Sequence, residues 1–205
     1  MAIISNAVTI ADAGAFSVGL GAMTHIKTVT ASNAATVSFV HGTSSVVLDS
    51  TYPIYKFEFI NIHGDTNDEA FTFNVSIDAG SNYNVAKTTT FFRTYHFEGD
   101  DGAALTYTAA FDLAQGTGFQ DINHYLSSAS DESCSGELSL YNPSSTTFVK
   151  HFIGVTNYYQ NFGKTGSFAV HYSGYCNTTA AIDGAQFKMS SGNIDSGTIS
   201  LFGIG

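Results

Sequence analysis

Hydrophobic side chains occupy every second position in the clearest segments of this chain. In the first segment, Phe57 and Phe59 alternate with the charged Lys56 and Glu58. Asn61 continues the parity of the two phenylalanines. A period of two is the geometry of a β-strand with one buried face and one solvated face. The segment is therefore predicted to be a half-buried strand.

A second segment repeats this rule. Over residues 71–77, Phe, Phe, Val and Ile are separated by Thr, Asn and Ser. The polar run 63–69 lies between the two segments. Two alternating strands joined by a short polar run are typical of a β-hairpin. The sequence thus predicts that residues 55–77 form one hairpin whose polar positions face solvent.

The same alternation of hydrophobic and polar residues continues along most of the chain. Gly, Asn, Asp, Ser and Pro stand between the alternating segments as turn residues. About ten short strands with turns every 8 to 12 residues predict an all-β fold, a single antiparallel β-sandwich of jelly-roll-like type. One short helical turn is expected at 121–126. Further strands are predicted at 25–30, 36–40, 46–48, 83–85, 88–97, 137–141, 146–155, 167–176, 185–189 and 198–204.

The first residues differ from the rest. Residues 1–24 are small and rich in Gly and Ala, which predicts an extended N-terminal arm or irregular strands, either docked on a neighbouring subunit or loose. Residues 25–205 are expected to form the sandwich, because a chain of 205 residues fits one domain of this class. No signal peptide and no apolar stretch of about 18 residues is found, so we expect cytoplasmic synthesis and no membrane partner.

Charge is scarce and mostly negative. Only 12% of the residues are charged, against roughly 25% in an average soluble domain, and the net charge is −10. The surface must therefore be built largely from Ser, Thr, Asn and Gly. The seven basic residues stand singly along the chain and form no stripe. This pattern predicts no nucleic-acid partner.

The polar run 63–69 is the best candidate for a cation site. Asp65, Asn67 and Glu69 alternate, and oxygen donors at alternate positions can converge on Ca²⁺. The run lacks the glycine and the closing glutamate of an EF-hand loop, and Asp, Asn and Gly are also the usual residues of turns. We favour the solvated turn and predict no metal site and no cofactor.

Several carboxylates invite a hydrolase hypothesis, because glycosidases use two carboxylates across the scissile bond. These residues lie in ordinary loop sequence, and the chain has no Trp for sugar stacking. No Gly-x-Ser-x-Gly elbow is present for a serine nucleophile. We predict that the protein is not an enzyme and that it has no catalytic residues. The carboxylates in question are Glu98, Asp100, Asp101, Asp131 and Glu132.

The seven histidines show no metal-type spacing, and His151 and His171 lie in strand-like runs, where we interpret them as core or sheet-face residues. Cys134 and Cys176 have a spacing unlike any metal or redox motif. Two isolated buried thiols are the favoured interpretation, and a disulfide between neighbouring strands is the alternative.

Aromatic residues are concentrated in the C-terminal third. Tyr158, Tyr159, Tyr172 and Tyr175 stand among many Ser, Thr and Asn. Such residues could form a patch that contacts glycan, or a seam between identical subunits, where Tyr is favoured. We favour the seam.

Six segments together resemble small structural proteins encoded by tailed phages of marine bacteria. The resemblance covers nearly all of the chain beyond residue 20, and it includes the closing Leu-Phe-Gly-Ile. It implies a β-sandwich virion component, either a head decoration protein or a part of a fibre or adhesin, and it carries over no catalytic residues. The segments are 21–32, 46–52, 56–63, 88–96, 141–152 and 187–204.

The favoured hypothesis is therefore a phage virion-surface protein that acts through multivalent protein contacts, as capsid decoration or cement. Its expected partners are copies of itself, as a homotrimer, and virion proteins such as the major capsid protein or tail components. Its expected location is the virion. The alternative is a tail-fibre module that binds host-surface glycan through Tyr and Asn side chains on loops. A glycan hydrolase is the third hypothesis.

Overall fold

A computed structural model of the chain describes residues 3–5, 8–12, 15–16, 23–160 and 163–205. Nearly every element in these ranges is a β-strand, and the one helical element among them is the short 3₁₀ turn η1 (Ala109–Phe111). The predicted all-β class is confirmed.

Three short strands near the N-terminus form a sheet of their own. They are β1 (Ile3–Ser5), β2 (Val8–Asp12) and β3 (Ala15–Phe16), and their pairings are antiparallel. The arm or irregular strands predicted for residues 1–24 fall partly on this sheet and partly on residues outside the described ones. The first strand of the sandwich begins at Met23.

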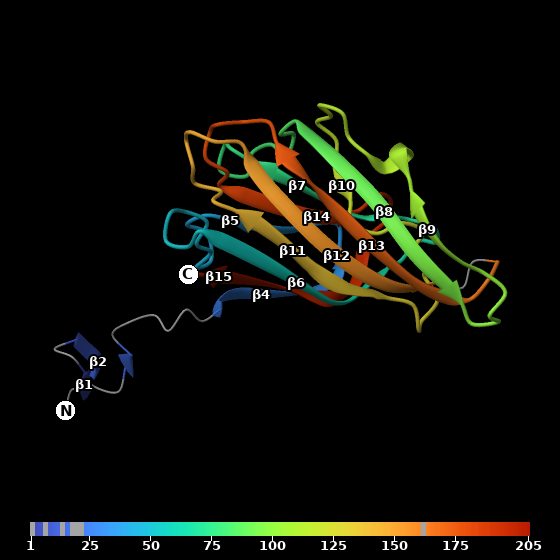
Figure 1. Ribbon diagram of the computed structural model, residues 1–205, viewed down its shortest axis with the longest axis horizontal. Helices are drawn as coiled ribbons and strands as arrows, with labels where there is room; N and C mark the ends of the chain where they lie inside the picture. Colours follow the sequence, from blue (N-terminus) through green and yellow to red (C-terminus); the bar gives the residue numbers. More distant parts are fainter. Residues whose placement is uncertain (1–2, 6–7, 13–14, 17–22, 161–162) are drawn as a thin grey trace.

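The larger layer of the sandwich is a sheet of eight strands, which run side by side across Figure 1. Every pairing within it is antiparallel. In spatial order its members are β4 (Met23–Ala34), β15 (Ile194–Ile204), β6 (Ile54–Gly64), β11 (Cys134–Tyr141), β12 (Lys150–Gln160), β13 (Gly166–Cys176), β8 (Lys87–Phe97) and β9 (Ala103–Tyr107).

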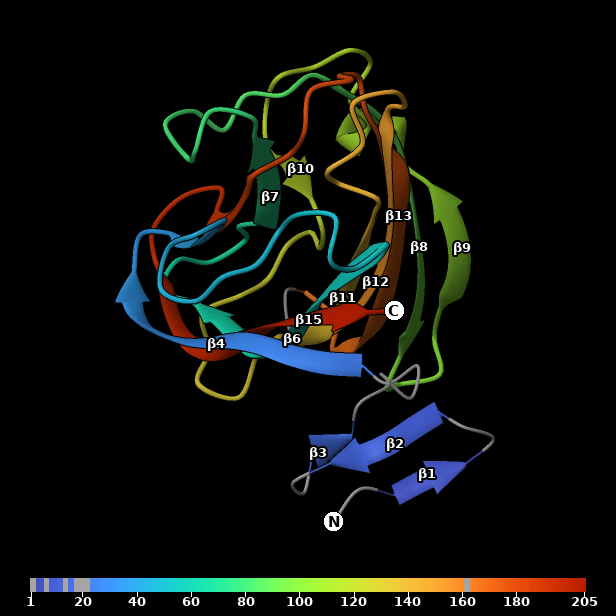
Figure 2. The ribbon, with the colours of Figure 1, turned by 90° about the vertical axis from the view of Figure 1, so that its left-hand side faces the viewer.

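The smaller layer has four antiparallel strands. Figure 2 shows the large sheet curving from β4 round to β9, with the small sheet on its concave side. This arrangement confirms the predicted antiparallel β-sandwich. In spatial order the small sheet contains β10 (Gln120–Asp121), β7 (Phe71–Ser76), β14 (Gly184–Met189) and β5 (Val37–Val40).

The hairpin predicted for residues 55–77 is wrong, because β6 and β7 belong to different sheets. Each strand of the small sheet is entered from the large sheet and left towards it. The two alternating segments therefore face each other across the core, where the rings of Phe59 and Phe71 lie 5.2 Å apart. Alternation identifies the buried face of a strand, but it does not identify the neighbouring strand.

The parity assigned to Asn61 is also wrong. Asn61 is exposed and has φ of 51°, and the register with β11 shifts at this point. One extra residue in β6 makes a β-bulge, and Asn is among the residues that tolerate the left-handed conformation. After the bulge the parity changes, so that Ile62 is fully buried.

The sequence predicts that the polar positions of β7 face solvent, and this prediction is wrong. Thr72, Asn74 and Ser76 are all buried. Asn74 explains why, since its side-chain amide donates to the carbonyls of Tyr83, 2.7 Å, and Thr117, 3.0 Å, in two loops that cover this face. Strand β7 is therefore buried on both sides, and its polar face is satisfied by loop backbone.

Aromatic rings fill the space between the sheets. Phe187 of β14 lies at the centre, with ring centroids of surrounding phenylalanines 5.1 to 6.4 Å away. Most of these contacts are edge-to-face, the arrangement that aromatic pairs prefer. The rings around Phe187 belong to Phe39, Phe57, Phe59, Phe71 and Phe73.

Several other boundaries differ from prediction. Residues 46–48 and 83–85 form no strand, and the strand expected at 146–155 runs instead over β12. It starts late because the Ser145 hydroxyl accepts hydrogen bonds from two following backbone amides and holds a turn. No helical turn forms at 121–126. That segment pairs with β7, and the Asn123 side chain accepts a bond from the Phe71 amide, 2.6 Å.

Candidate functional site

The outer face of β8, β12 and β13 is the most distinctive surface of the described chain. Its outward positions carry no Asp, Glu, Lys or Arg, although the chain has a net charge of −10. Alternate positions of a strand point to one face, so these side chains form one continuous surface. We call this surface the neutral face. It consists of Thr88, Thr90, Phe92, Thr94, His96, His151, Ile153, Val155, Asn157, Tyr159, Ser167, Ala169, His171, Ser173 and Tyr175.

The two predicted sheet-face histidines lie on the neutral face and are exposed. The ring of His171 stacks on that of Phe92, with centroids 5.0 Å apart and planes 6° apart. The ring of His151 lies 6.4 Å from that of Tyr175. Both histidines thus belong to ring pairs between neighbouring strands, which stabilise a sheet surface.

A shallow groove lies at one end of the neutral face, on the side of β11. It is lined by Tyr141, His151, Ile153, Ser173 and Tyr175, together with the backbone of β13 at a glycine. Ile153 is 56% exposed, which leaves an apolar side chain uncovered between polar and aromatic neighbours. We call this feature the Tyr175 groove.

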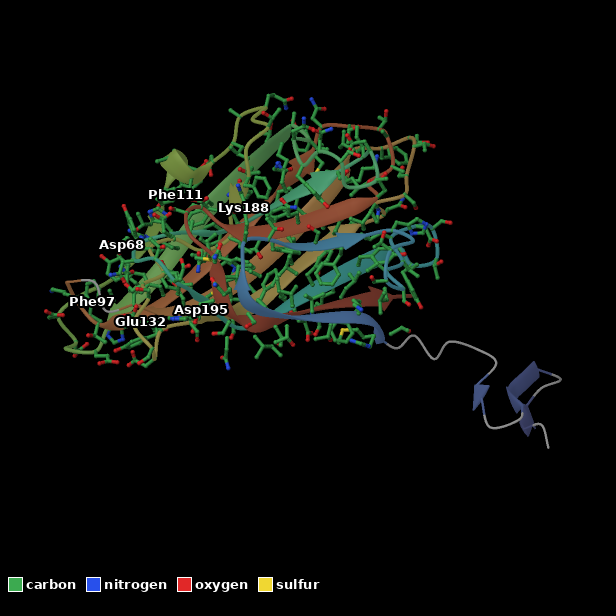
Figure 3. The ribbon with its side chains drawn as sticks, turned by 180° about the vertical axis from the view of Figure 1, so that it is seen from behind. Asp68, Phe97, Phe111, Glu132, Lys188 and Asp195 are labelled. Carbon is green, nitrogen blue, oxygen red and sulfur yellow. The ribbon has the colours of Figure 1, made fainter. Side chains whose placement is uncertain are left out.

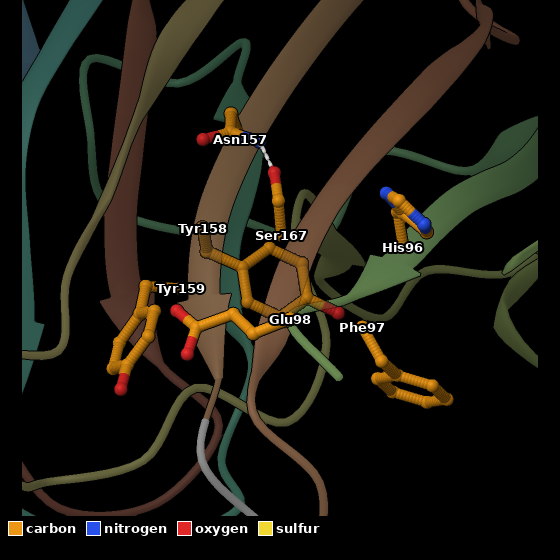
Figure 4. Close-up of a pocket in the computed structure, with 8 residues that line it drawn as sticks. His96, Phe97, Glu98, Asn157, Tyr158, Tyr159 and Ser167 are labelled. Carbon is orange, nitrogen blue, oxygen red and sulfur yellow. Dashed lines mark hydrogen bonds between the residues drawn. The ribbon is translucent and has the colours of Figure 1, made fainter. Parts of the chain in front are cut away.

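A larger hollow, of about 470 Å³, opens where β8, β12 and β13 end (Figure 4). Its walls include His96, Glu98 and Tyr159, and Gly166 leaves room between the strands. A side chain could not replace this glycine, because an added Cβ would lie 2.7 Å from the backbone oxygen of His96.

A serine and a histidine line the hollow close to each other, and the carboxylate of Asp100 lies beside this histidine. Ser167 is the cross-strand partner of His96, and His96 Nε2 lies 3.0 Å from Asp100 Oδ1. However, the Ser167 hydroxyl accepts a bond from Asn157, 3.0 Å, as the dashed line in Figure 4 shows. The histidine and the aspartate are also largely exposed. The group lacks the buried, serine-to-histidine connection that activates a nucleophile.

The candidate hydrolase carboxylates lie towards this same end of the sandwich, where Figure 3 labels Phe97 and Glu132. Partial burial raises the pKa of Tyr159, and the negative charges of Asp131 and Glu98 raise it further. Tyr159 therefore stands between these two acids. Asp101 is paired with Lys164 at 2.7 Å, which lowers its pKa, and Glu132 is buried.

The predicted tyrosine patch is corrected by the structure. Tyr158 and Tyr172 point inward and are each 1% exposed. Burial raises the pKa of Tyr172 well above its usual value, and its hydroxyl donates to the Glu137 carbonyl, 2.8 Å. Successive residues of a strand point to opposite faces, so the adjacent Tyr158 and Tyr159 cannot share one surface. Only Tyr159 and Tyr175 remain on the neutral face.

The oxygens of the 63–69 run do not converge. Each of the three candidate cation ligands accepts a hydrogen bond from another part of the chain: Asp65 and Glu69 from the turn between β14 and β15, and Asn67 from Ser128. These bonds fasten the 63–69 turn. The bond from a backbone amide lowers the pKa of Asp65. Among the described residues, no group of three or more His, Cys, Asp or Glu is placed to hold a metal ion. The pairs are Asp65 with Asn193, Asn67 with Ser128, and Glu69 with Ser190.

A buried row of charged and ionisable groups was missed by the sequence reasoning. Lys87, Cys176 and Lys150 are cross-strand partners on β8, β13 and β12, and each is 0% exposed. Lys87 Nζ donates to Asn74 Oδ1, 2.6 Å, and Lys150 Nζ donates to the Ala180 carbonyl, 2.6 Å. We call this row the closed end of the inner face.

Burial shifts the pKa values of all three groups in this row. It lowers the pKa of Lys87 to about 8 and lowers that of Lys150. It raises the pKa of the Cys176 thiol to about 12, although the two lysines oppose this change. Cys134, on β11, is also buried with a pKa raised to about 12. Both thiols are free, which confirms the favoured interpretation, and β12 lies between their strands.

Two triplets of the sequence, Asn74-Val-Ser and Asn177-Thr-Thr, match the N-glycosylation pattern, and their asparagines differ in exposure. Asn74 is 0% exposed, whereas Asn177 lies at the surface. A glycan needs a surface asparagine, so the first triplet is not available in the folded protein.

Comparison of the chain with known protein families, curated proteins and solved structures gives no match. Across the described ranges, no helix is long and apolar enough to cross a membrane.

Proposed function

We propose that this protein is a structural component of a phage virion surface and that it acts by contact of its neutral face with neighbouring copies. The single observation that carries this function is the absence of charged side chains from the outward positions of β8, β12 and β13. The resemblance of the chain to small phage structural proteins supports the assignment to a virion.

The physical argument concerns repulsion between identical acidic molecules. A net charge of −10 opposes the approach of two copies, and this opposition is weakest where no carboxylate must be desolvated. Aromatic side chains are also favoured at the centres of protein interfaces, while Lys, Glu and Asp are depleted there. The neutral face therefore fits a second copy of this chain better than the remaining acidic surface does.

Sedimentation velocity over a range of protein concentrations tests the proposal. We expect concentration-dependent association, with a trimer as the predicted species, and we expect Ile153→Glu to abolish it, because a buried charge would oppose the contact. Ile77→Glu is the matched control, since Ile77 is also exposed, at 42%, but follows a strand of the small sheet. A parent protein that remains monomeric, or a control as damaging as Ile153→Glu, would refute the proposal.

The position on the particle requires a separate measurement. Gold-labelled antibody against the protein, applied to particles of the encoding phage, should mark the virion. Labelling of the head supports decoration, and labelling of the tail supports a fibre component. Absence of the protein from purified particles would contradict the virion assignment even if the protein associates with itself.

A second candidate function is glycan recognition at the Tyr175 groove. The supporting observation is the placement of Tyr141, Tyr175 and His151 around one exposed hollow, since sugars are commonly held against ring faces. Binding to a glycan array that is lost in Tyr175→Ala would support it, and an array without signal for folded protein would oppose it. We do not propose a hydrolase, because no observation favours it over binding.

A further inference from the structure

A second cavity, of about 260 Å³, lies on the inner face of β8, β12 and β13, at the end opposite the closed end. At this end the large sheet lies next to the segment 109–126, and Tyr125 of that segment also lines the cavity. We call this cavity the Arg93 pocket. It is lined by Arg93, Tyr95, Phe97, Tyr125, Gln160 and Phe168.

Aromatic rings form most of its wall. Tyr95 stacks on Phe168 with centroids 5.6 Å apart, and Phe97 lies 4.9 Å from Tyr95. The guanidinium carbon of Arg93 lies 5.9 Å from the centre of the Phe168 ring. A cation held against a ring face is kept extended and accessible on its other edge.

Two polar groups in the pocket are left without partners. Gln160 is only 5% exposed, yet its Oε1 accepts no hydrogen bond within the described chain. Arg93 Nε is likewise buried without an acceptor. Buried polar atoms in native proteins are nearly always paired, so an unpaired acceptor beside an unpaired donor indicates that a ligand or water completes them.

The charge of Arg93 is also uncompensated. Arg93 is the only arginine of the chain, and none of the ion pairs between described residues includes it. Arg93 also interacts with the neighbouring Tyr158. Burial raises the pKa of Tyr158 to about 12, and both the charge of Arg93 and its hydrogen bond to the tyrosine oppose the increase. The unpaired atom of the guanidinium group is therefore its Nε. An arginine fork that is partly desolvated matches a carboxylate, which it can hold through two parallel hydrogen bonds.

We propose that the Arg93 pocket binds one acidic sugar unit, of the uronic acid class. Its carboxylate lies on the Arg93 guanidinium, the apolar face of its ring packs on Tyr95 or Phe97, and one hydroxyl donates to Gln160 Oε1. A simple aromatic acid would satisfy the arginine and the rings but has no hydroxyl for Gln160. The proposal is independent of self-association through the neutral face.

Isothermal titration with D-glucuronate, D-glucose and benzoate tests this site on the full chain. We expect saturable binding of glucuronate, no detectable binding of glucose at about 10 mM, and weaker binding of benzoate than of glucuronate. Arg93→Met should weaken glucuronate binding by about tenfold or more, since it removes a charge-assisted hydrogen bond. Gln160→Met should weaken it by about threefold or more.

Two controls keep the result interpretable. Phe148→Ala removes a side chain that is 68% exposed and lines neither the Arg93 pocket nor the Tyr175 groove, so it should leave glucuronate binding unchanged. Arg93→Lys keeps the charge but removes the fork, so it should bind more weakly than the parent. Each variant is checked for a native circular dichroism spectrum. No saturable glucuronate binding, equal binding by parent and Arg93→Met, or tighter binding of benzoate would overturn the proposal. Loss of self-association would not affect it.

Discussion

The inner face of β8, β12 and β13 carries a cation near each end, and the two ends differ in what surrounds it. At the closed end, Lys87 and Lys150 donate to Asn74 and to loop carbonyls at 2.6 to 3.2 Å. At the other end, the Arg93 Nε has no acceptor, and Gln160 Oε1 has no donor.

The difference separates a structural cation from an available one. A buried ammonium that bonds only to protein oxygens fixes the loops that supply them, and its replacement leaves those oxygens unpaired. A guanidinium that still lacks an acceptor can gain one without breaking a protein contact. The same three strands therefore use two lysines to fasten the sandwich, while the Nε of their one arginine is left without an acceptor.

Removal of Asn74 should break the closed end and give the largest loss of stability. Asn74→Ala leaves the Lys87 ammonium with one acceptor fewer and leaves the carbonyls of Tyr83 and Thr117 without a donor. We expect the free energy of unfolding in urea to fall by about 3 to 5 kcal/mol. Arg93→Met, at the open end, should change it by less than about 1 kcal/mol.

Asn177→Ala is the matched control for this prediction. Asn177 is exposed and donates one side-chain bond, to Gln115. Its replacement should alter the free energy of unfolding by no more than about 0.5 kcal/mol. Equal losses for Asn74→Ala and Arg93→Met would show that the two ends do not differ as described.

Between the two ends the inner face is packed without space, and a smaller loss is expected there. Gly154 lies beneath the Tyr172 ring, and an added Cβ would lie 2.2 Å from a ring carbon. Gly154→Ala should cost about 2 kcal/mol of unfolding free energy, because Tyr172 must move and its bond to the Glu137 carbonyl is strained. Gly118→Ala, where no atom lies within 4 Å, serves as control. A Gly154→Ala variant as stable as the parent would contradict this packing.

The two ends should also differ in their response to pH. Burial lowers the folded-state pKa of Lys87 from its usual value of 10.5 to about 8, so the unfolded chain binds more protons between these two pH values. Stability rises with pH wherever the unfolded state binds more protons. The advantage of the parent over Lys87→Met should therefore grow by about 1 kcal/mol from pH 7 to pH 9. The difference in unfolding free energy between the parent and Arg93→Met is expected to stay constant from pH 7 to pH 9.

These urea titrations should be run on all three proteins at both pH values. The raised cysteine pKa values act in the opposite direction near pH 9, but they are common to the parent and the variants and largely cancel in the differences. A difference between parent and Lys87→Met that shrinks with rising pH would show that the Lys87 ammonium is not desolvated.

Sequence periodicity predicts the strands well and their partners poorly. The alternation around Phe57 and Phe71 correctly identifies two strands that each place one face in the core. It cannot show that these two faces lie opposite each other. Asn74 stands between Phe73 and Val75, so the alternation predicts that its side chain faces solvent. Loop carbonyls nine and 43 residues further along the chain cover it instead.

The candidate sites show the same limit. The neutral face consists of alternate positions of three predicted strands. The sequence shows that these positions lack charged residues, but only when it is known that the three strands are neighbours. The closed end and the Arg93 pocket could not be predicted, because Lys87, Arg93 and Lys150 stand singly in the sequence. Their burial depends on which loops cover the sheet, and single-residue patterns carry no information on that.

The smallest effect is expected in the reactivity of the two thiols. The labelling rate of Cys176 measures how often the closed end opens. Burial raises the pKa of both Cys134 and Cys176 to about 12, so almost no thiolate forms near pH 8 and the native protein should react with a disulfide reagent only through local opening. Cys176 belongs to the closed end and Cys134 lies on β11. In Asn74→Ala the labelling of Cys176 should therefore accelerate more than that of Cys134, as mass spectrometry of the labelled peptides would show. Equal acceleration would mean that the variant opens the sandwich as a whole, and the closed end would then not be a local unit.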